Sequence, residues 1–301
     1  MFSVIHDLLP CGVRAAAIVG LGSSLSEVRP FQIQQGNPVL GMPADSSKAD
    51  AILIFGGDGT VHRHLPDLVR LKLPVLVVPC GSGNDFARSL GLLSVGHAVA
   101  AWKKFVAGEN NVSAVDLGVI ATPSQPEPHY FSCVAGVGLD TATARIANQL
   151  PRWLRAHGGY ALSLPLALTR FAPPHVDLLV HNTAGEFTTH SSAPRVLAAF
   201  ANTPWYGGGM RIAPRADMTD GLLDACLIAC FAGPLSKAKL LGLFPSVYSG
   251  KHLSFPEVEY FQCPRFQLNT QQPADVYADG EFVCQTPVEV SIEPRALRVI
   301  T

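Results

Sequence analysis

Short apolar runs alternate with an amphipathic stretch in the first third of the chain. Arg14–Val19, Ala51–Phe55 and Pro74–Val78 are predicted strands, and the last two are continuous apolar runs, as expected of strands buried on both faces. Val95–Val106 has the period of an amphipathic helix, and Gly108 beyond it is a helix-ending residue. Strands that alternate with helices in this way predict a parallel α/β sheet.

The pattern changes after about Ala121. A proline-rich connection, TPSQPEPH, leads to many short β-type segments separated by Gly, Pro and Asn, and helical stretches interrupt them near Ala142–Leu168 and Leu235–Ser249. Short strands with turn residues between them favour a β-sandwich or a partial barrel. We therefore expect an α/β domain over residues 1–121 and a β-rich domain over residues 122–289.

Composition narrows the function classes. Of the 301 residues, 48% are hydrophobic and 15% are charged, and the net charge is −1, which excludes a disordered chain and lacks the basic surplus of a nucleic-acid binder. No run approaches the roughly 18 apolar residues of a membrane span, and the opening residues lack a secretory signal. The 7 cysteines include no C-x-x-C pair and fit free thiols in a reducing cytosol. We expect a cytoplasmic protein without a transmembrane segment or a nucleic-acid partner.

A first glycine-rich motif directly follows the second predicted strand. It consists of Gly56, Gly57, Asp58, Gly59 and Thr60. Glycines let the backbone approach a ligand closely, and the N-terminus of the following helix, expected near Val61, favours phosphate. Asp58 suits a metal–water network or an orienting role, and a plain strand–helix turn is the alternative. Pro66 predicts a kink in this helix, and His62 and His64, on different helix faces, are taken as incidental.

A second motif repeats the arrangement after the third strand. Its members are Gly81, Ser82, Gly83, Asn84, Asp85 and Arg88. Asp85 fits a helix cap, and Arg88, one turn further on the same face, is placed to pair with a carboxylate or a phosphate. Ligands bind at the carboxyl edge of open α/β sheets, so the two turns predict one crevice there.

Taken together, GGDGT and GSGNDFAR resemble the catalytic domain of the diacylglycerol kinase family, which includes sphingosine and ceramide kinases and bacterial lipid kinases. The resemblance continues through Val115–Gly118, Phe131–Asp140, Gly207–Leu223, Ala278–Glu281 and Ile292–Leu297. It implies a Rossmann-like α/β nucleotide domain followed by a C-terminal β-sandwich domain. It also implies that the last strand, at about residues 290–301, returns to the first domain.

The resemblance further implies how ATP and Mg²⁺ are held. The two glycine-rich turns, from Gly56 to Thr60 and from Gly81 to Asn84, would cradle the ATP phosphates. A carboxylate–water network would surround the catalytic Mg²⁺, supported by a cation. The members of this network would be Asp58, Asp85, Asp116 and Arg88.

Two later motifs would complete the site. By the same resemblance, Asp279 would be the general base that takes the proton of the lipid hydroxyl, and Glu281 is the alternative. Asp217, Asp220 and the carbonyl of Leu222 would hold a second, structural Mg²⁺, which prefers hard oxygen ligands. An Asp-Gly pair is also a common turn, so the order of the motifs carries these assignments.

The function implied is an ATP-dependent lipid kinase that phosphorylates the hydroxyl of diacylglycerol or a related lipid alcohol at the membrane surface, as a peripheral protein. Phosphoryl transfer needs positioning and charge neutralisation, which these residue types supply. Two alternatives stay open: an NAD-kinase-type nucleotide kinase, and a non-catalytic lipid- or nucleotide-binding relative. The second is motivated by Gly20–Ser24, which stands where the family has an Asn-Pro-x-Ser-Gly turn. A homodimer is compatible with the sequence.

Overall fold

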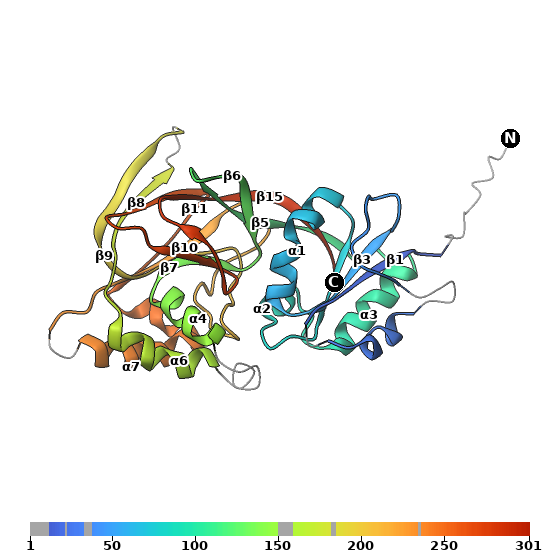
Figure 1. Ribbon diagram of the computed structural model, residues 1–301, viewed down its shortest axis with the longest axis horizontal. Coiled ribbons are helices and arrows are strands. Elements are labelled where there is room, and N and C mark those ends of the chain that lie inside the picture. Colours follow the sequence, from blue (N-terminus) through green and yellow to red (C-terminus); the bar gives the residue numbers. More distant parts are fainter. Residues whose placement is uncertain (1–11, 22, 33–37, 150–158, 182–184, 234–235) are drawn as a thin grey trace.

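The computed structural model describes residues 12–21, 23–32, 38–149, 159–181, 185–233 and 236–301. Two lobes lie side by side along the long axis (Figure 1). The N-terminal lobe is a parallel sheet covered by helices, and the C-terminal lobe is a pair of antiparallel sheets with helices below them in this view. The predicted fold class, α/β followed by a β-sandwich, is confirmed.

The N-terminal lobe is built on four parallel strands in the order β2-β1-β3-β4. The strands are β1 (Ala15–Val19), β2 (Val39–Leu40), β3 (Ala51–Gly56) and β4 (Val75–Pro79). The helices are α1 (Asp58–Leu71), α2 (Asp85–Ser89) and α3 (Val95–Val106), with short 3₁₀ turns η1 (Leu25–Glu27) and η2 (Arg29–Phe31). Every residue of β3 is buried, as its continuous apolar run predicts.

Helix α1 begins earlier than expected and is not broken by its proline. It starts at Asp58 rather than Val61, because Gly57 supplies the extended N-cap conformation. Pro66 lies inside the helix, where a missing N–H and a clash with the His62 carbonyl cost about 3 kcal/mol. A buried apolar stripe on the sheet side offsets this cost. It consists of Val61, Leu65, Leu68 and Leu71.

The C-terminal lobe is an antiparallel sandwich. Its strands are β6 (Gln125–Phe131), β7 (Val134–Gly138), β8 (His175–His181), β9 (Phe187–Ala201), β10 (Leu223–Ala229), β11 (Val258–Cys263), β12 (Arg265–Thr270), β13 (Asp275–Ala278) and β14 (Glu281–Gln285). The long β9 joins the two sheets, because its first half pairs with β8 and its second half with β7 and β10. The helical layer consists of α4 (Leu139–Gln149), α6 (Gly159–Arg170), α7 (Ser236–Ser249) and η3 (Lys251–Ser254).

Two long strands run through both lobes. β5 (Val112–Thr122) and β15 (Val288–Ile300) pair antiparallel along most of their length, with an irregularity between Glu293 and Leu297. Beyond it, β15 pairs parallel to β4 at Val299 and Val75, so the end of the chain lies in the N-terminal sheet (Figure 1). The chain therefore crosses between the lobes on β5 and returns on β15.

Asp116 joins three segments at this crossing. Its side chain is buried, Oδ1 accepts a hydrogen bond from Arg295 N–H at 2.7 Å, and Oδ2 accepts one from Gly221 N–H at 2.8 Å. The Asp116 N–H donates to the carbonyl of Met218 at 2.7 Å. Arg295 has a left-handed φ of 55° at the β15 irregularity. Asp116 thus ties β5 to the bend in β15 and to the loop before β10.

Replacement of Asp116 by Asn tests this structural role. The amide would present an N–H₂ group to one of two backbone donors, so we expect a loss of about 2 to 4 kcal/mol in unfolding free energy, measured by urea denaturation. The exposed Asp67, which pairs with Arg70, is the matched control, and Asp67→Asn should change stability by less than about 1 kcal/mol. An unchanged urea midpoint in Asp116→Asn, with nucleotide binding lost, would instead favour the predicted role in the ATP site.

Candidate active site

The two glycine-rich turns touch at the carboxyl ends of β3 and β4. A Cβ added to Gly57 would lie 2.3 Å from the carbonyl oxygen of Gly83, and one added to Gly81 would lie 2.3 Å from the Cα of Gly57. Asp58 N–H donates to the same Gly83 oxygen at 3.0 Å. Only glycine fits at these positions, because the two backbones are in direct contact. The two turns therefore form one surface.

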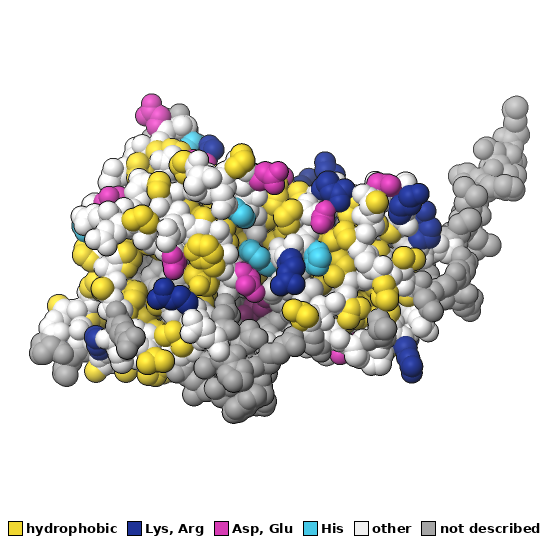
Figure 2. All heavy atoms as spheres, in the orientation of Figure 1, with side chains coloured by type: hydrophobic (Ala, Val, Ile, Leu, Met, Phe, Trp, Pro, Cys, Tyr) yellow, Lys and Arg dark blue, Asp and Glu magenta, His cyan; other side chains and the backbone are white. Residues whose placement is uncertain are grey.

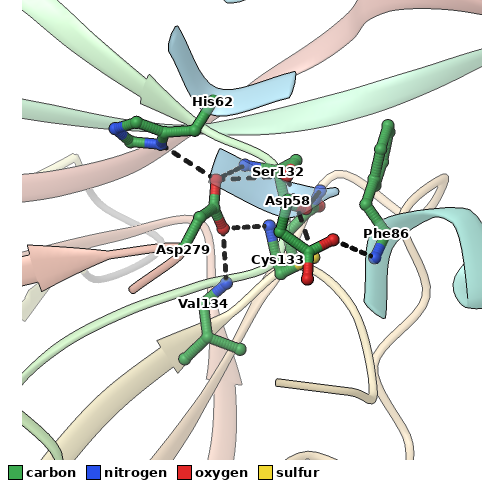
Figure 3. A network of polar contacts seen from close by, with 8 residues as sticks. Asp58, His62, Phe86, Ser132, Cys133, Val134 and Asp279 are labelled. Atoms are coloured by element: carbon green, nitrogen blue, oxygen red, sulfur yellow. Dashed lines mark hydrogen bonds and ion pairs between the residues drawn. The ribbon is translucent and has the colours of Figure 1, made fainter. Parts of the chain in front are cut away.

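Asp58 connects the first turn to the second. Its Oδ2 accepts a hydrogen bond from Asp85 N–H and its Oδ1 accepts one from Phe86 N–H, each at 3.0 Å (Figure 3). Asp58 thus satisfies backbone donors in the first turn of α2. Burial and the negative charge of Asp85 raise the pKa of Asp58 to about 7.

Asp85 reaches from α2 to the C-terminal lobe. Its side chain is buried, and Oδ2 accepts a hydrogen bond from Gly208 N–H at 2.7 Å. Oδ1 is buried and accepts no hydrogen bond from the described residues, although Arg88 Nη1 lies 3.7 Å away. Burial raises the pKa of Asp85. Two neighbouring carboxylates, the half-buried Asp58 and the buried Asp85, fit a divalent cation or a water bound to one.

Asn84 and Arg88 shape the site from behind. Asn84 closes the second turn, because its Oδ1 accepts from Gly81 N–H at 3.0 Å and its Nδ2 donates to the Gly81 carbonyl at 2.8 Å. Arg88 lies over the Trp205 ring, 5.3 Å from its centre. A Cβ at Gly209 would meet Arg88 Nη1 at 2.5 Å. Neither side chain lines the cleft described below.

Asp279 is anchored on the backbone of the C-terminal lobe. It occupies the turn between β13 and β14 with a left-handed φ of 51°. Its Oδ1 accepts from the N–H groups of Cys133 and Val134 at 2.8 and 3.3 Å, and its Oδ2 accepts from Ser132 N–H at 2.8 Å and Ser132 Oγ at 3.1 Å (Figure 3). His62 Nδ1, on α1 of the other lobe, lies 3.1 Å from Oδ2.

The charge of Asp279 follows from these contacts. Burial by itself would raise the pKa of Asp279, but hydrogen bonds and the charge of His62, with backbone donors at Ser132 and Cys133, lower it below its ordinary value. Glu281, two residues further on, is exposed. A Cβ at Gly59 would lie 3.0 Å from Glu281 Oε1, so this carboxylate lies over the start of α1.

These elements surround a cleft of about 560 Å³ between the lobes. The predicted site residues that line it are Gly57, Asp58, Gly59, Thr60, Gly81, Ser82, Gly83, Asp85, Asp279 and Glu281. Gly56 lies behind them in β3, where a Cβ would meet the Thr60 side chain at 2.5 Å. Leu21, in the altered first turn, also lines the cleft. Figure 2 shows histidine, acidic and basic side chains gathered where the lobes meet.

A second, apolar cavity of about 40 Å³ adjoins the cleft and lies between the helical layer and strands β9 and β10. Asp140 and Tyr206 line both spaces. Burial raises the pKa of Asp140 to about 7. The apolar walls include Leu139, Leu164, Leu197, Leu240, Leu243 and Val247. A polar cleft and an apolar cavity therefore meet at one half-buried carboxyl group.

Besides Asn84 and Arg88, two groups of predicted residues stand apart from the cleft. Asp116 is not among its lining residues, because both of its oxygens are occupied at the lobe crossing. In the predicted metal loop, Asp217 Oδ1 accepts from Thr219 N–H at 2.9 Å, and Asp220 Oδ1 accepts from Leu222 N–H at 2.9 Å. Among the described residues, no three or more His, Cys, Asp and Glu side chains cluster as a metal site. The predicted metal loop offers two carboxylates and a main-chain carbonyl, which is fewer than three such side chains.

Two residues of this region were not predicted from the sequence. His62, taken as incidental, contacts Asp279; its place four residues after Asp58, on the same face of a helix, was the available signal. Asp140 was seen only as the end of an apolar strand motif. Its position between the cleft and the cavity depends on the packing of α4 against β9, which has no local signature.

Comparisons with known proteins agree with this architecture. A family model for the diacylglycerol kinase catalytic domain matches residues 27–120, and one for the YegS C-terminal NAD kinase beta sandwich-like domain matches residues 133–301. A diacylglycerol kinase of Mycobacterium tuberculosis is 34% identical over 258 residues, which cover 83% of this chain and 76% of the relative. A diacylglycerol kinase of Bacillus subtilis is 25% identical over 250 residues, covering 80% and 74%.

Solved structures share the fold. One chain from Bacillus anthracis superposes with a TM-score of 0.70 and 19% identity, covering 97% of this chain and 98% of that one. A diacylglycerol kinase structure from the same organism has a TM-score of 0.64 and 16% identity, covering 97% of each chain. The two family models and the relative that is 34% identical confirm the resemblance seen in the motifs. The chain belongs to the diacylglycerol kinase family of lipid kinases, phosphotransferases that use an alcohol group as acceptor.

Proposed function

We propose that this chain transfers the γ-phosphoryl group of ATP to the hydroxyl of diacylglycerol or a related lipid alcohol. The observation that carries the proposal is the junction of a glycine-walled polar cleft with an apolar cavity at Asp140 and Tyr206. The cleft has the volume of a nucleotide pocket, and the cavity suits the end of an acyl chain. A whole chain would require α6 and α7 to move apart. The name of the Mycobacterium tuberculosis relative supports diacylglycerol as the acceptor.

The nucleotide phosphates would lie on the paired turns, Gly57–Thr60 and Gly81–Gly83. No side chain fits where the turns touch, so phosphate oxygens can approach the backbone N–H groups, and the N-terminus of α1 favours negative charge there. Leu21 would border the nucleotide, since the altered first turn lies at this edge of the cleft.

The catalytic Mg²⁺ would be held by Asp58 and Asp85, directly or through water, with Arg88 beside them. Asp85 Oδ1, which accepts no hydrogen bond from the described residues, and the repulsion between the two carboxylates support this assignment. When bound, such an ion would neutralise the negative charge that develops on the phosphates during transfer. For the structural Mg²⁺, we retain Asp217, Asp220 and the Leu222 carbonyl, a set of hard oxygen ligands.

Asp279 would accept the proton of the lipid hydroxyl. Its carboxylate is ionised and can accept a proton, and its backbone anchors hold it still, which suits a base in a reaction limited by positioning. Five donors already surround it, so one contact must loosen when the hydroxyl approaches. Glu281 is the alternative, because it is exposed, lines the cleft and makes fewer fixed contacts.

The lipid would be reached from a membrane surface through the helical layer. The chain has no Asp or Glu between Asp140 and Asp177, and none between Asp224 and Glu257. On α7, Lys237 and Lys239 are exposed. An anionic bilayer attracts such a basic, acid-free face, whereas a second copy of the same face would repel it.

Apolar side chains on the same layer complement the charge. Leu241, Pro245 and Tyr248 are exposed at spacings of four and three residues, so they form one outer stripe of α7. Leu166 of α6 is 59% exposed, and Lys237 Nζ donates to the Thr169 carbonyl at 3.4 Å, which places the two helices side by side. Hydrophobic side chains reach the surface along the lower left edge of the molecule (Figure 2).

Membrane contact would therefore be peripheral. Among the residues that the structure describes, no helix is long and apolar enough to cross a membrane. The cytoplasmic location and the homodimer remain predictions of the sequence.

The reaction is tested with labelled ATP, Mg²⁺ and mixed micelles that contain diacylglycerol or a total lipid extract. We expect the label in the organic phase. Label in a water-soluble nucleotide would favour the NAD-kinase-type alternative. Lipid binding by calorimetry without any transfer, under conditions where a related kinase is active, would favour a non-catalytic protein.

The identity of the base is tested with a matched pair of amides. Asp279→Asn should lower kcat by roughly 10² to 10⁴ because general-base catalysis contributes that much, while Glu281→Gln should stay within about tenfold of the unaltered enzyme. Circular dichroism checks that both variants fold. The reverse ranking of the two kcat values would make Glu281 the base.

The docking face is tested by sedimentation with vesicles of phosphatidylcholine and phosphatidylglycerol. Lys237→Glu with Lys239→Glu should weaken binding at least about tenfold, since each basic residue near an anionic surface contributes about 1 kcal/mol. Lys103→Glu with Lys104→Glu, exposed on α3 of the other lobe, is the control with the same charge change. Equal losses in the two double variants would point to a global charge effect and remove the assignment to α7.

A further inference from the structure

His62 is the contact through which the N-terminal lobe reaches Asp279. Its side chain is 16% exposed and that of Asp279 is 0% exposed, with Nδ1 and Oδ2 3.1 Å apart. The four other donors to Asp279 come from Ser132, Cys133 and Val134 in the C-terminal lobe. Figure 3 shows the imidazole approaching Oδ2 from α1, on the side away from these backbone groups. Among the described residues, His62 alone ties this carboxylate to the nucleotide lobe.

His62 does not itself face the cleft. Thr60, two residues before it, and Arg63, the next residue, line the cleft, but His62 does not. With Nδ1 bound to Asp279, only Nε2 is left to accept a proton, and the side chain that carries it does not line the cleft. Any effect of His62 on phosphoryl transfer must therefore pass through Asp279.

The charges around the imidazole favour its protonated form. Asp279 and Glu281 are the acidic groups that act on it, and the charge of His62 in turn lowers the pKa of the neighbouring His129 of β6. Burial lowers the pKa of His62, but Asp279 and Glu281 raise it above its ordinary value overall. The same contact lowers the pKa of Asp279. The two side chains thus form a buried, charge-assisted pair across the lobes.

We infer that His62 is a positioning residue for phosphoryl transfer, which holds the Asp279 carboxylate in register with the nucleotide lobe through the hydrogen bond between Nδ1 and Oδ2. This inference rests on the proposed function. The pair fixes where α1, with Asp58 at its first residue, stands relative to Asp279. Since α1 carries the start of the phosphate cradle, the distance from donor to acceptor in the reaction depends on this contact.

Two substitutions separate the hydrogen bond from the charge. Asn places its Nδ2 where His places Nδ1, so His62→Asn keeps a donor without a positive charge, whereas His62→Leu keeps neither. His64→Leu is the matched control, because His64 lies on the same helix and, among the described residues, neither pairs with Asp279 nor lines the cleft.

Two kinetic quantities are measured: the dependence of kcat on pH, and the KM for ATP. His62→Leu should lower kcat by about 10- to 100-fold, and His62→Asn should lower it less. The pair depresses the pKa of Asp279, so its loss lets Asp279 protonate at higher pH, and the acid limb of kcat should move upward in both variants. The KM for ATP and the behaviour of His64→Leu should stay unchanged. An unaltered acid limb and kcat in His62→Leu would overturn the inference.

A measurement that does not depend on enzyme activity distinguishes failure of this inference from failure of the proposed function. In ¹³C-histidine NMR, the resonance that His62→Asn removes identifies His62, and its pKa should fall when Asp279 is replaced by Asn. An unchanged His62 pKa in Asp279→Asn would disprove the pair. A wild-type enzyme that labels no lipid, with the NMR shift present, would instead overturn the proposed function and the role of His62 in it, and leave only the contact.

Discussion

Backbone N–H groups that donate to buried aspartates hold the cleft together. Asp58 binds the first turn of α2, Asp85 binds Gly208, Asp116 binds Gly221 and Arg295, and Asp279 binds three successive residues of the β6–β7 bend. Each bond joins segments that are distant in sequence. A buried carboxylate is tolerated only when it is hydrogen-bonded, so these contacts fix both the charge of the site and the relation of the two lobes.

The few charged residues of the chain are unevenly distributed in this arrangement. Several of its few carboxylates are placed where the lobes meet, and the stretches that form α4, α6 and α7 carry no acidic residue after Asp140. The interior of the site is therefore negative and suited to a cation, while the helical layer is apolar and basic. The net charge of the chain, close to zero, does not reveal that acidic and basic residues are separated in space. Only their positions in the structure show it.

Local patterns predicted most of the N-terminal lobe. The apolar runs of β3 and β4 and the period of α3 appear where expected, because strands buried on both faces and amphipathic helices have strong sequence signatures. Pro66 lies inside α1 without ending it, since a buried stripe against the sheet keeps the helix continuous, and the kink expected there stays a prediction. The start of α1 was misplaced because Gly57, rather than a side-chain cap, supplies its N-cap.

The sequence by itself determined the two glycine-rich turns and their place at the ends of adjacent strands, because backbone contacts as close as those of Gly57 and Gly81 admit no other residue. The motifs built on these turns also identified the family. Only the tertiary structure decided which carboxylates meet. Asp116 is drawn away to the lobe crossing, and His62 is brought to Asp279 across 217 positions of sequence. Such pairs depend on how β5 and β15 carry the chain between the lobes, and no local pattern of residues encodes a distance of that kind.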